Sequence, residues 1–540
     1  MDKAATRYDY VIAGGGSAGC VLAARLSEDP DIRVLLIEAG SSDSHPMIHI
    51  PAGFTKLAGP RVNWGYKTVP QRHLNDREMW YPQGRTLGGG SSINAMIYTR
   101  GHAADYDRWA REGCDQWSYD QVLPYFRKAE ANSRLNNVYH GIDGPLSVSD
   151  PISPREITRA FLKAAQDTGA RFTPDFNGES QTGVGFHQTT TVRGRRASAA
   201  VCYLHPARSR PNLDVATRAT TTRLLIEKGR AVGVRYRQDR NGEEQEVRAD
   251  REVLVTSGAI GSPKLLMLSG IGRPDHLRGH GIDVVHELTG VGENLQDHLD
   301  CYVTAYCDGP HSYFGTDRYF EQAWWALQYI LFGNGPATTN VVEAGGFVSV
   351  DPASEIPDTQ LHFLPAFVIE HGMVRVKDYG ISLYTNFLRP HSRGNVRLRS
   401  ADPGAAPLID PGYFSAEEDR RMAVEALKYA REILARPAIA KYLKGEHMPG
   451  PDVRTDAELL DYARAWAKTD YHPVGTCRMG EDAEAVVDQR LRVRGVEGLR
   501  VCDSSVMPSE ISGNTNAPTI MIAERAAEMI KADAAGARAA

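Results

Sequence analysis

The sequence lacks three features that would place the protein in other broad classes. It has no basic excess, since 62 lysines and arginines stand against 67 acids for a formal charge of −5; we therefore expect no nucleic acid partner. Its longest apolar stretches, such as residues 324–332, are far shorter than the ~20 residues of a membrane-spanning helix. A strand pattern begins at Tyr8 and leaves no space for a secretory signal, so we expect a cytoplasmic protein.

Cysteine is also scarce. The 7 cysteines are scattered and form no C-x-x-C pair, which indicates reduced, mostly buried thiols rather than a disulfide framework or a metal site. The 540 residues, 42% hydrophobic and 24% charged, are typical of a folded chain that is too long for one ordinary core. We therefore expect several domains or one large interleaved pair.

The first forty residues carry the sharpest local signal. A short apolar strand, YDYVIA at residues 8–13, runs into a turn in which Gly14, Gly16 and Gly19 fill G-x-G-x-x-G. A helical pattern and a second strand at residues 33–37 follow. Glycines in this context permit a tight turn and let a pyrophosphate approach a helix N-terminus. The sequence predicts a dinucleotide site.

Glu38 ends the second strand. A carboxylate about twenty residues beyond the glycine turn takes the ribose hydroxyls in such sites. Its charge argues against a 2′-phosphate and thus against NADP, but it does not separate NAD from FAD.

The rest of the chain predicts an interleaved organisation of the α/β class. Residues 221–257 have the pattern of a three-stranded antiparallel meander, residues 499–502 that of another strand, and residues 518–531 that of a final helix. Between these lie predicted strands at 362–367, 381–389 and 395–399 and an amphipathic helix at 422–434. A doubly wound domain is thus predicted to alternate with an α+β domain.

Two more glycine motifs, GRTLGGGSSIN at 84–94 and GAIGSPKLLMLSGIG at 258–272, decide the cofactor. Both resemble the two signature patterns of the glucose–methanol–choline (GMC) family of FAD oxidoreductases. GVGENLQDH at 290–298, YHPVGTCRMG at 471–480, and the segments 501–508 and 514–519 resemble further segments of that family, in the same order. The resemblance covers nearly the whole chain, and within the family the sequence resembles choline-dehydrogenase-like members.

The resemblance implies a Rossmann-like FAD-binding domain over residues 1–150, 194–298 and 467–540, and a substrate domain with an antiparallel sheet over 151–193 and 299–466. It implies oxidation of a primary alcohol, choline-like, aryl or alkyl, with oxygen, a quinone or a redox protein as electron acceptor. Relatives that hold FAD covalently use a histidine just before Asn94; Ile93 stands there, so we expect non-covalent FAD.

The resemblance also assigns the site residues. His472 is the expected base and Asn516 its catalytic partner, and His298 is expected to be structural. A base with a pKa near the operating pH is needed, because hydride does not readily leave a carbon whose oxygen keeps its proton. An amide donor stabilises the developing alkoxide. The expected FAD-binding residues are Gly14, Gly16, Ser17, Ala18, Gly19, Glu38, Ala39, Arg85, Gly88, Gly89, Ser92, Asn94, Ala95, Met96, Thr221, Ser257, Gly258, Asp503, Asn516, Pro518 and Thr519.

The substrate side is less determined. Glu343, His362 and Tyr471 are expected to face the substrate, although Glu343 and His362 have pairing within the second domain as an equal alternative. The aromatic run at 324–332 is expected to be buried core; the alternatives are an ammonium cage, an apolar lid or a membrane contact. A homodimer is a further possibility that the sequence leaves open.

Two other activities occur on this scaffold and remain alternatives. One is a flavin-containing hydroxynitrile-type lyase, which performs no net oxidation. The other is a light-driven decarboxylase, against which the retained His472 and Asn516 argue.

Overall fold

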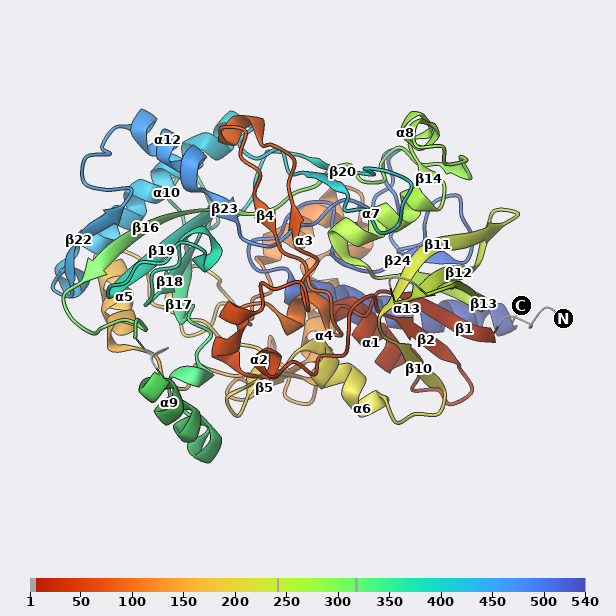
Figure 1. The fold of residues 1–540 in the computed structure, drawn as a ribbon, viewed down its shortest axis with the longest axis horizontal. Coiled ribbons are helices and arrows are strands. Elements are labelled where there is room, and N and C mark those ends of the chain that lie inside the picture. The colour runs from red at the N-terminus through yellow and green to blue at the C-terminus, as the bar shows by residue number, and fades with distance from the viewer. Residues whose placement is uncertain (1–5, 240–241, 316–318, 540) are drawn as a thin grey trace.

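The computed structural model describes residues 6–239, 242–315 and 319–539. Within them, two seven-stranded sheets lie at opposite ends of the molecule (Figure 1). No helix among these residues is long and apolar enough to cross a bilayer. The cysteines are free thiols, and all but Cys202 are buried.

The first sheet collects strands from the beginning, middle and end of the chain, as predicted. Its order is β10-β2-β1-β13-β12-β11, with β24 also paired to β13. The parallel strands are β1 (Thr6–Ala13), β2 (Val34–Ile37), β10 (Leu213–Ala216), β13 (Glu244–Val255) and β24 (Leu499–Val501). The predicted meander is β11 (Ala219–Glu227), β12 (Arg230–Gln238) and β13.

Helices cover this sheet and bring the two chain ends together. Helix α1 (Ser17–Leu26) packs against α13 (Asn516–Ala539), and α13 also packs against α4 (Tyr119–Ala129). An ion pair between Arg25 and buried Glu524, 2.7 Å long, joins α1 to α13. All four residues of β2 are buried, as expected of a parallel strand with both faces covered. Helix α13 is longer than predicted and begins two residues earlier.

The second sheet is antiparallel, with the order β22-β16-β19-β18-β17-β7, and β23 also pairs with β16. Helices α10 (Glu417–Ala435) and α5 (Glu156–Asp167) pack on it, and α12 (Asp456–Trp466) packs on α10. The strands are β7 (Gly183–Phe186), β16 (Leu299–Cys307), β17 (Ala344–Val348), β18 (Thr359–Leu364), β19 (Gly380–Phe387), β22 (Leu443–Met448) and β23 (Lys468–Thr469).

One prediction about this region is confirmed and one is wrong. The strand expected at 395–399 is present as β20 (Asn395–Arg397), which is shorter than predicted and pairs with β21 (Leu408–Asp410) in a separate two-stranded sheet. The aromatic run is not core. It lies in helix α9 (Tyr319–Phe332), which projects from the molecule (Figure 1) and exposes Trp324, Ile330 and Phe332 to 60%, 76% and 71%.

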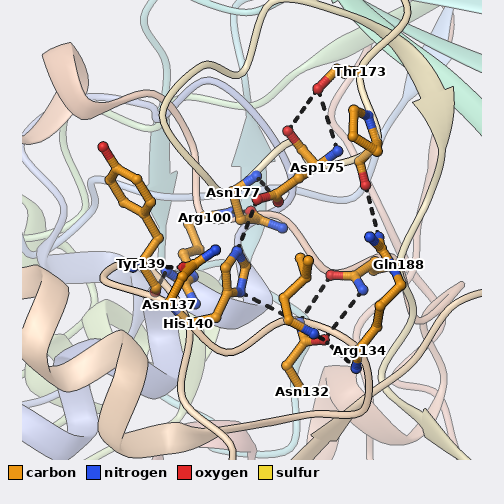
Figure 2. Close-up of polar contacts among 12 residues, drawn as sticks. Arg100, Asn132, Arg134, Asn137, Tyr139, His140, Thr173, Asp175, Asn177 and Gln188 are labelled. Atoms are coloured by element: carbon orange, nitrogen blue, oxygen red, sulfur yellow. Dashed lines mark hydrogen bonds and ion pairs between the residues drawn. The ribbon is translucent and has the colours of Figure 1, made fainter.

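A buried polar network connects the segment before residue 150 to the segment after it (Figure 2). The His140 ring lies between Glu130 and Asp175, at 3.1 and 3.0 Å, and Arg100 donates to Glu130 at 2.7 Å. Burial alone would lower the pKa of His140, but the hydrogen bonds that its ring donates to the two carboxylates outweigh burial and raise that pKa. Arg100 is therefore part of the charge balance that stabilises the fold.

Candidate active site

A cavity of about 1030 Å³ is lined by elements that belong to both sheets. One side is formed by the turn after β1 and by the starts of α13 and of α7 (Gly258–Leu268); the other is formed by residues of β18, β19, β23 and α9. This volume is at the upper end of the ~300–1,000 Å³ typical of small-ligand sites. The space suits a large cofactor together with a small substrate.

Each of the three glycines in the turn after β1 has a different structural role. Gly14 has φ +120, and a Cβ there would lie 2.5 Å from the carbonyl oxygen of Thr256. A Cβ on Gly19 would lie 1.9 Å from the carbonyl oxygen of Gly14, so this glycine lets α1 pack against the turn. A Cβ on Gly16 would meet only one atom, at 3.8 Å, and Gly16 lines the cavity. The open side of Gly16 is the place where a phosphate can approach the backbone.

Glu38 lies at the end of β2 and lines the same cavity, together with Ala39. Its carboxylate accepts the N–H groups of Gly15 and Gly40, at 2.8 and 2.7 Å. Burial raises the pKa of Glu38 to about 7, against the effect of those two bonds. The glycine turn therefore orients this carboxylate.

The second glycine loop packs on the first. The N–H of Gly88 donates to the carbonyl of Gly15 at 2.8 Å, and a Cβ on Gly89 would lie 2.8 Å from the Cα of Gly16. Gly89 lines the cavity, and so do Asn94, Ala95 and Met96. Gly88 and Ser92 do not line it; both are buried, and the Ser92 hydroxyl donates to the carbonyl of Leu87 at 2.7 Å.

Arg196 is a residue of this region that sequence reasoning missed. Its buried guanidinium donates to the side-chain oxygen of Asn94 at 2.7 Å and to the carbonyl of Ser91 at 3.0 Å. Burial lowers the pKa of Arg196 to about 9. It lies on a two-residue strand outside all quoted motifs, so no local signal pointed to it.

Asp503 organises the third part of the cradle. Its carboxylate accepts the N–H of Gly258 at 2.9 Å and the hydroxyl of Ser262 at 2.6 Å. The side chain thus serves the start of α7, and the residue lines the cavity beside Thr221, Ser257 and Gly258.

His472 lies at the wall of the cavity, buried and hydrogen-bonded at both ring nitrogens. Its Nδ1 is 3.0 Å from Nδ1 of His298, and its Nε2 is 2.8 Å from the amide nitrogen of Asn514. The other nitrogen of His298, Nε2, is 3.0 Å from the carbonyl oxygen of Leu388. The three residues and Leu388 form one chain of contacts.

This chain determines where the hydrogens are. A carbonyl oxygen only accepts, so His298 donates from Nε2 to Leu388. Burial lowers the pKa of His298 to about 4, so the ring is neutral and its Nδ1 is an acceptor. His472 must then donate from Nδ1, which leaves its Nε2 as the unprotonated nitrogen that accepts from Asn514.

The amide that contacts His472 belongs to Asn514, which the sequence analysis did not single out. Asn516, the predicted partner, begins α13, lines the cavity and accepts the hydroxyl of Ser17 at 2.8 Å. Both asparagines stand in one short segment, GNTNAPT, so the motif was visible but did not show which amide turns towards the imidazole. Thr519 also lines the cavity, whereas Pro518 does not.

The three predicted substrate residues occupy different places. His362 and Tyr471 line the cavity. Glu343 does not: it is buried and accepts from the backbone N–H of Arg155 at 2.9 Å and the hydroxyl of Thr158 at 2.5 Å, so the second of its two alternatives, pairing inside the second domain, holds. Arg85 likewise does not line the cavity; its guanidinium lies 4.8 Å from the centre of the Trp64 ring.

Two family profiles described as GMC oxidoreductase match residues 8–300 and 390–523. The chain belongs to the GMC oxidoreductase family. It is 45% identical to an alcohol dehydrogenase [acceptor] of Pseudomonas putida over 97% of this chain and 95% of that protein. It is 46% identical to oxygen-dependent choline dehydrogenase 1 of Chromohalobacter salexigens over 98% and 95%.

Solved structures agree with this assignment. Pyridoxine 4-oxidase from Mesorbium loti superposes with a TM-score of 0.88 at 33% identity over 96% of this chain and 98% of that one. A formate oxidase from Aspergillus oryzae, whose structure concerns FAD modification, superposes with a TM-score of 0.91 at 27% identity over 98% of each chain. This GMC oxidoreductase is an FAD enzyme that acts on CH–OH groups. The glycine cradle open at Gly16 fits the cofactor.

Proposed function

We propose that this GMC oxidoreductase oxidises a primary alcohol to the aldehyde, with His472 as the base that removes the hydroxyl proton. The observation that carries the proposal is the unprotonated Nε2 of a buried His472 at the cavity wall. FAD, when bound, supplies the acceptor for the hydride. The chain's own residues must bind the cofactor, orient the alcohol and take the proton.

The proton transfer follows from the hydrogen-bond chain. In the free site, Nε2 of His472 accepts from the amide of Asn514. A substrate hydroxyl takes the place of that donor, and its proton moves to Nε2 as the C–H bond breaks. The amides of Asn514 and Asn516 then become donors for the developing alkoxide oxygen. The N-terminus of α13, where Asn516 stands, adds a partial positive charge that favours the electron-rich product state.

The cofactor-binding residues follow from the cavity wall. Gly16 and the start of α1 are proposed to hold the pyrophosphate and Glu38 the ribose hydroxyls, while the second glycine loop and the α13 N-terminus face the flavin. We propose non-covalent FAD because Ile93 has no nucleophile. The domain limits given above are proposed to separate the cofactor part from the substrate part, although β23, at residues 468–469, pairs with β16 of the second sheet.

Several partner predictions rest on less. The electron acceptor is proposed to be oxygen, a quinone or a redox protein, and the location is proposed to be the cytoplasm. The exposed apolar residues of α9 support a contact with a membrane surface or with a second copy of the chain. The lyase alternative gains no support, since the relatives described above are named as dehydrogenases and oxidases.

Anaerobic mixing with alcohols tests the proposal. Oxidation bleaches the flavin absorbance, whereas lyase chemistry leaves it unchanged. His472→Ala should slow flavin reduction by a factor on the order of 10²–10⁴ while FAD stays bound. His73→Ala, at an exposed histidine outside the cavity, is the matched control and should reduce at the wild-type rate. Reduction of the His472→Ala variant at the wild-type rate would refute the base assignment.

A further inference from the structure

The ammonium group of Lys468 occupies an aromatic corner of the cavity. Lys468 lines the cavity but is only 2% exposed. Its Nζ lies 4.4 Å from the ring centre of Tyr384 and 5.1 Å from that of Tyr471. Both tyrosines line the cavity as well. The two ring faces thus hold a cation that belongs to the chain itself.

The nearest carboxylate is also engaged. Asp300, fully buried on β16, accepts from Nζ of Lys468 at 2.5 Å. Asp470 accepts from Asn386 at 3.2 Å and contacts His362 at 3.3 Å. Burial lowers the pKa of His362 to about 4, so this imidazole is neutral. Asp300 is therefore the carboxylate that pairs with Lys468 directly, and Asp470 is the second acid that acts on its charge.

We propose that Lys468 is a specificity-determining residue that makes this site select uncharged alcohols and exclude quaternary ammonium alcohols such as choline. A quaternary ammonium is bound by aromatic faces and a nearby carboxylate. Here the ammonium group of Lys468 lies over the ring faces of Tyr384 and Tyr471 and pairs with Asp300. A second cation would find both ring faces and the Asp300 carboxylate already engaged, beside an ammonium group of its own sign. The inference rests on the proposed function and names its substrate class.

The wild-type protein provides the first test. Choline is compared with its neutral isostere, in which a tert-butyl group replaces the trimethylammonium group. Anaerobic flavin reduction should favour the isostere by a factor on the order of 10² in kcat/KM, as expected where like charges cost several kcal/mol. Calorimetric titration of the FAD-loaded protein with tetramethylammonium should show no binding at millimolar concentration. Equal use of both alcohols, or tetramethylammonium binding, would overturn the proposal.

Variants then test whether the lysine is the cause. Lys468→Met removes the ammonium and leaves Asp300 and both rings; it should bind tetramethylammonium and lower the preference for the isostere by at least about 10-fold. The double variant Lys468→Met with Asp300→Asn should lose that binding again. Lys264→Met is the matched control, since Lys264 also lines the cavity but donates to the carbonyls of Pro403 and Ala405; it should behave as wild type towards the cation.

The outcomes separate this proposal from the one on which it rests. Calorimetry needs no turnover, so a protein that oxidises no alcohol but binds the cation only after Lys468→Met would refute the proposed function and keep the charge argument. If neither single variant binds the cation, the lysine is not what excludes it. The wild-type comparison stands even if a variant does not fold.

Discussion

The Nδ1 atoms of His298 and His472 lie 3.0 Å apart, and the hydrogen between them belongs to His472. This follows because the neutral His298 ring donates its one ring N–H, at Nε2, to the carbonyl of Leu388. His298, expected from the sequence to be structural, therefore acts on the proposed chemistry through His472, whose Nε2 it leaves unprotonated.

His298→Ala should impair the reaction without impairing substrate binding. Without that acceptor, the Nδ1 hydrogen of His472 keeps only the more distant carboxylate of Asp470, 3.5 Å away, and the orientation and tautomer of the ring are less well fixed. We expect the rate of flavin reduction to fall by about 10² with little change in KM. His298→Asn, whose amide oxygen can accept near the same place, should recover part of the rate. A purely structural role predicts instead that both variants lose stability and that the surviving enzyme reduces normally.

The pH profile of kcat/KM should have its acid limb at low pH. Burial, aided by His298, His362 and Lys468, lowers the pKa of His472 well below its usual value. A base works when unprotonated, so a lowered pKa keeps it active at acidic pH. We expect kcat/KM to be level from about pH 6.5 upwards through neutrality and to fall only below it. In Lys468→Met the limb should move to higher pH; a wild-type limb centred above pH 6.5 would contradict this assignment.

A pair of glycine variants separates cofactor binding from folding. Gly16 has φ −73 and no close neighbour at its Cβ position, so Gly16→Ala should fold normally but fill the space proposed for the phosphate. We expect its FAD affinity to fall by at least about 10-fold, measured as flavin content after dialysis. Gly19→Ala places a methyl group 1.9 Å from the carbonyl of Gly14 and should lower the melting temperature of the apoprotein. Equal flavin content in Gly16→Ala and wild type would contradict the phosphate placement.

The network around His140 should make a pH-dependent contribution to stability. The raised pKa of His140 means that its contribution is complete below the unfolded value, about 6.5, and is lost as pH rises through the folded value. The pKa values of Glu130 and Asp175 are lowered, so the contribution of these two carboxylates to stability is present above about pH 4 and is lost as pH falls. The substitution His140→Ala should therefore lower the free energy of unfolding most, by about 3 kcal/mol, at pH values between these limits.

Denaturant unfolding at several pH values measures this difference. The difference in the free energy of unfolding between wild type and His140→Ala should become smaller towards alkaline pH. His73→Ala, at an exposed histidine, should show no gap at any pH. A gap that is constant with pH would mean that His140 contributes by packing rather than by charge.

The sequence by itself determined the features that neighbouring residues make. The strand–turn–helix around Gly14, Gly16 and Gly19 was predictable because tight turns and close approaches need glycine locally, and the position of Glu38 follows from strand length. The meander and the helix α10 were visible as short periodic patterns. The family resemblance located His472 for the same reason, through a contiguous motif.

Only the tertiary structure decided which distant groups meet. It turned Asn514 rather than Asn516 towards His472, joined Lys468 to Asp300 across two strands, and enclosed Glu343 among donors of its own domain. It also left the apolar α9 exposed, where composition predicted core. Side-chain direction and long-range pairing depend on how two sheets and their connecting segments close around one cavity, and no local pattern records that closure.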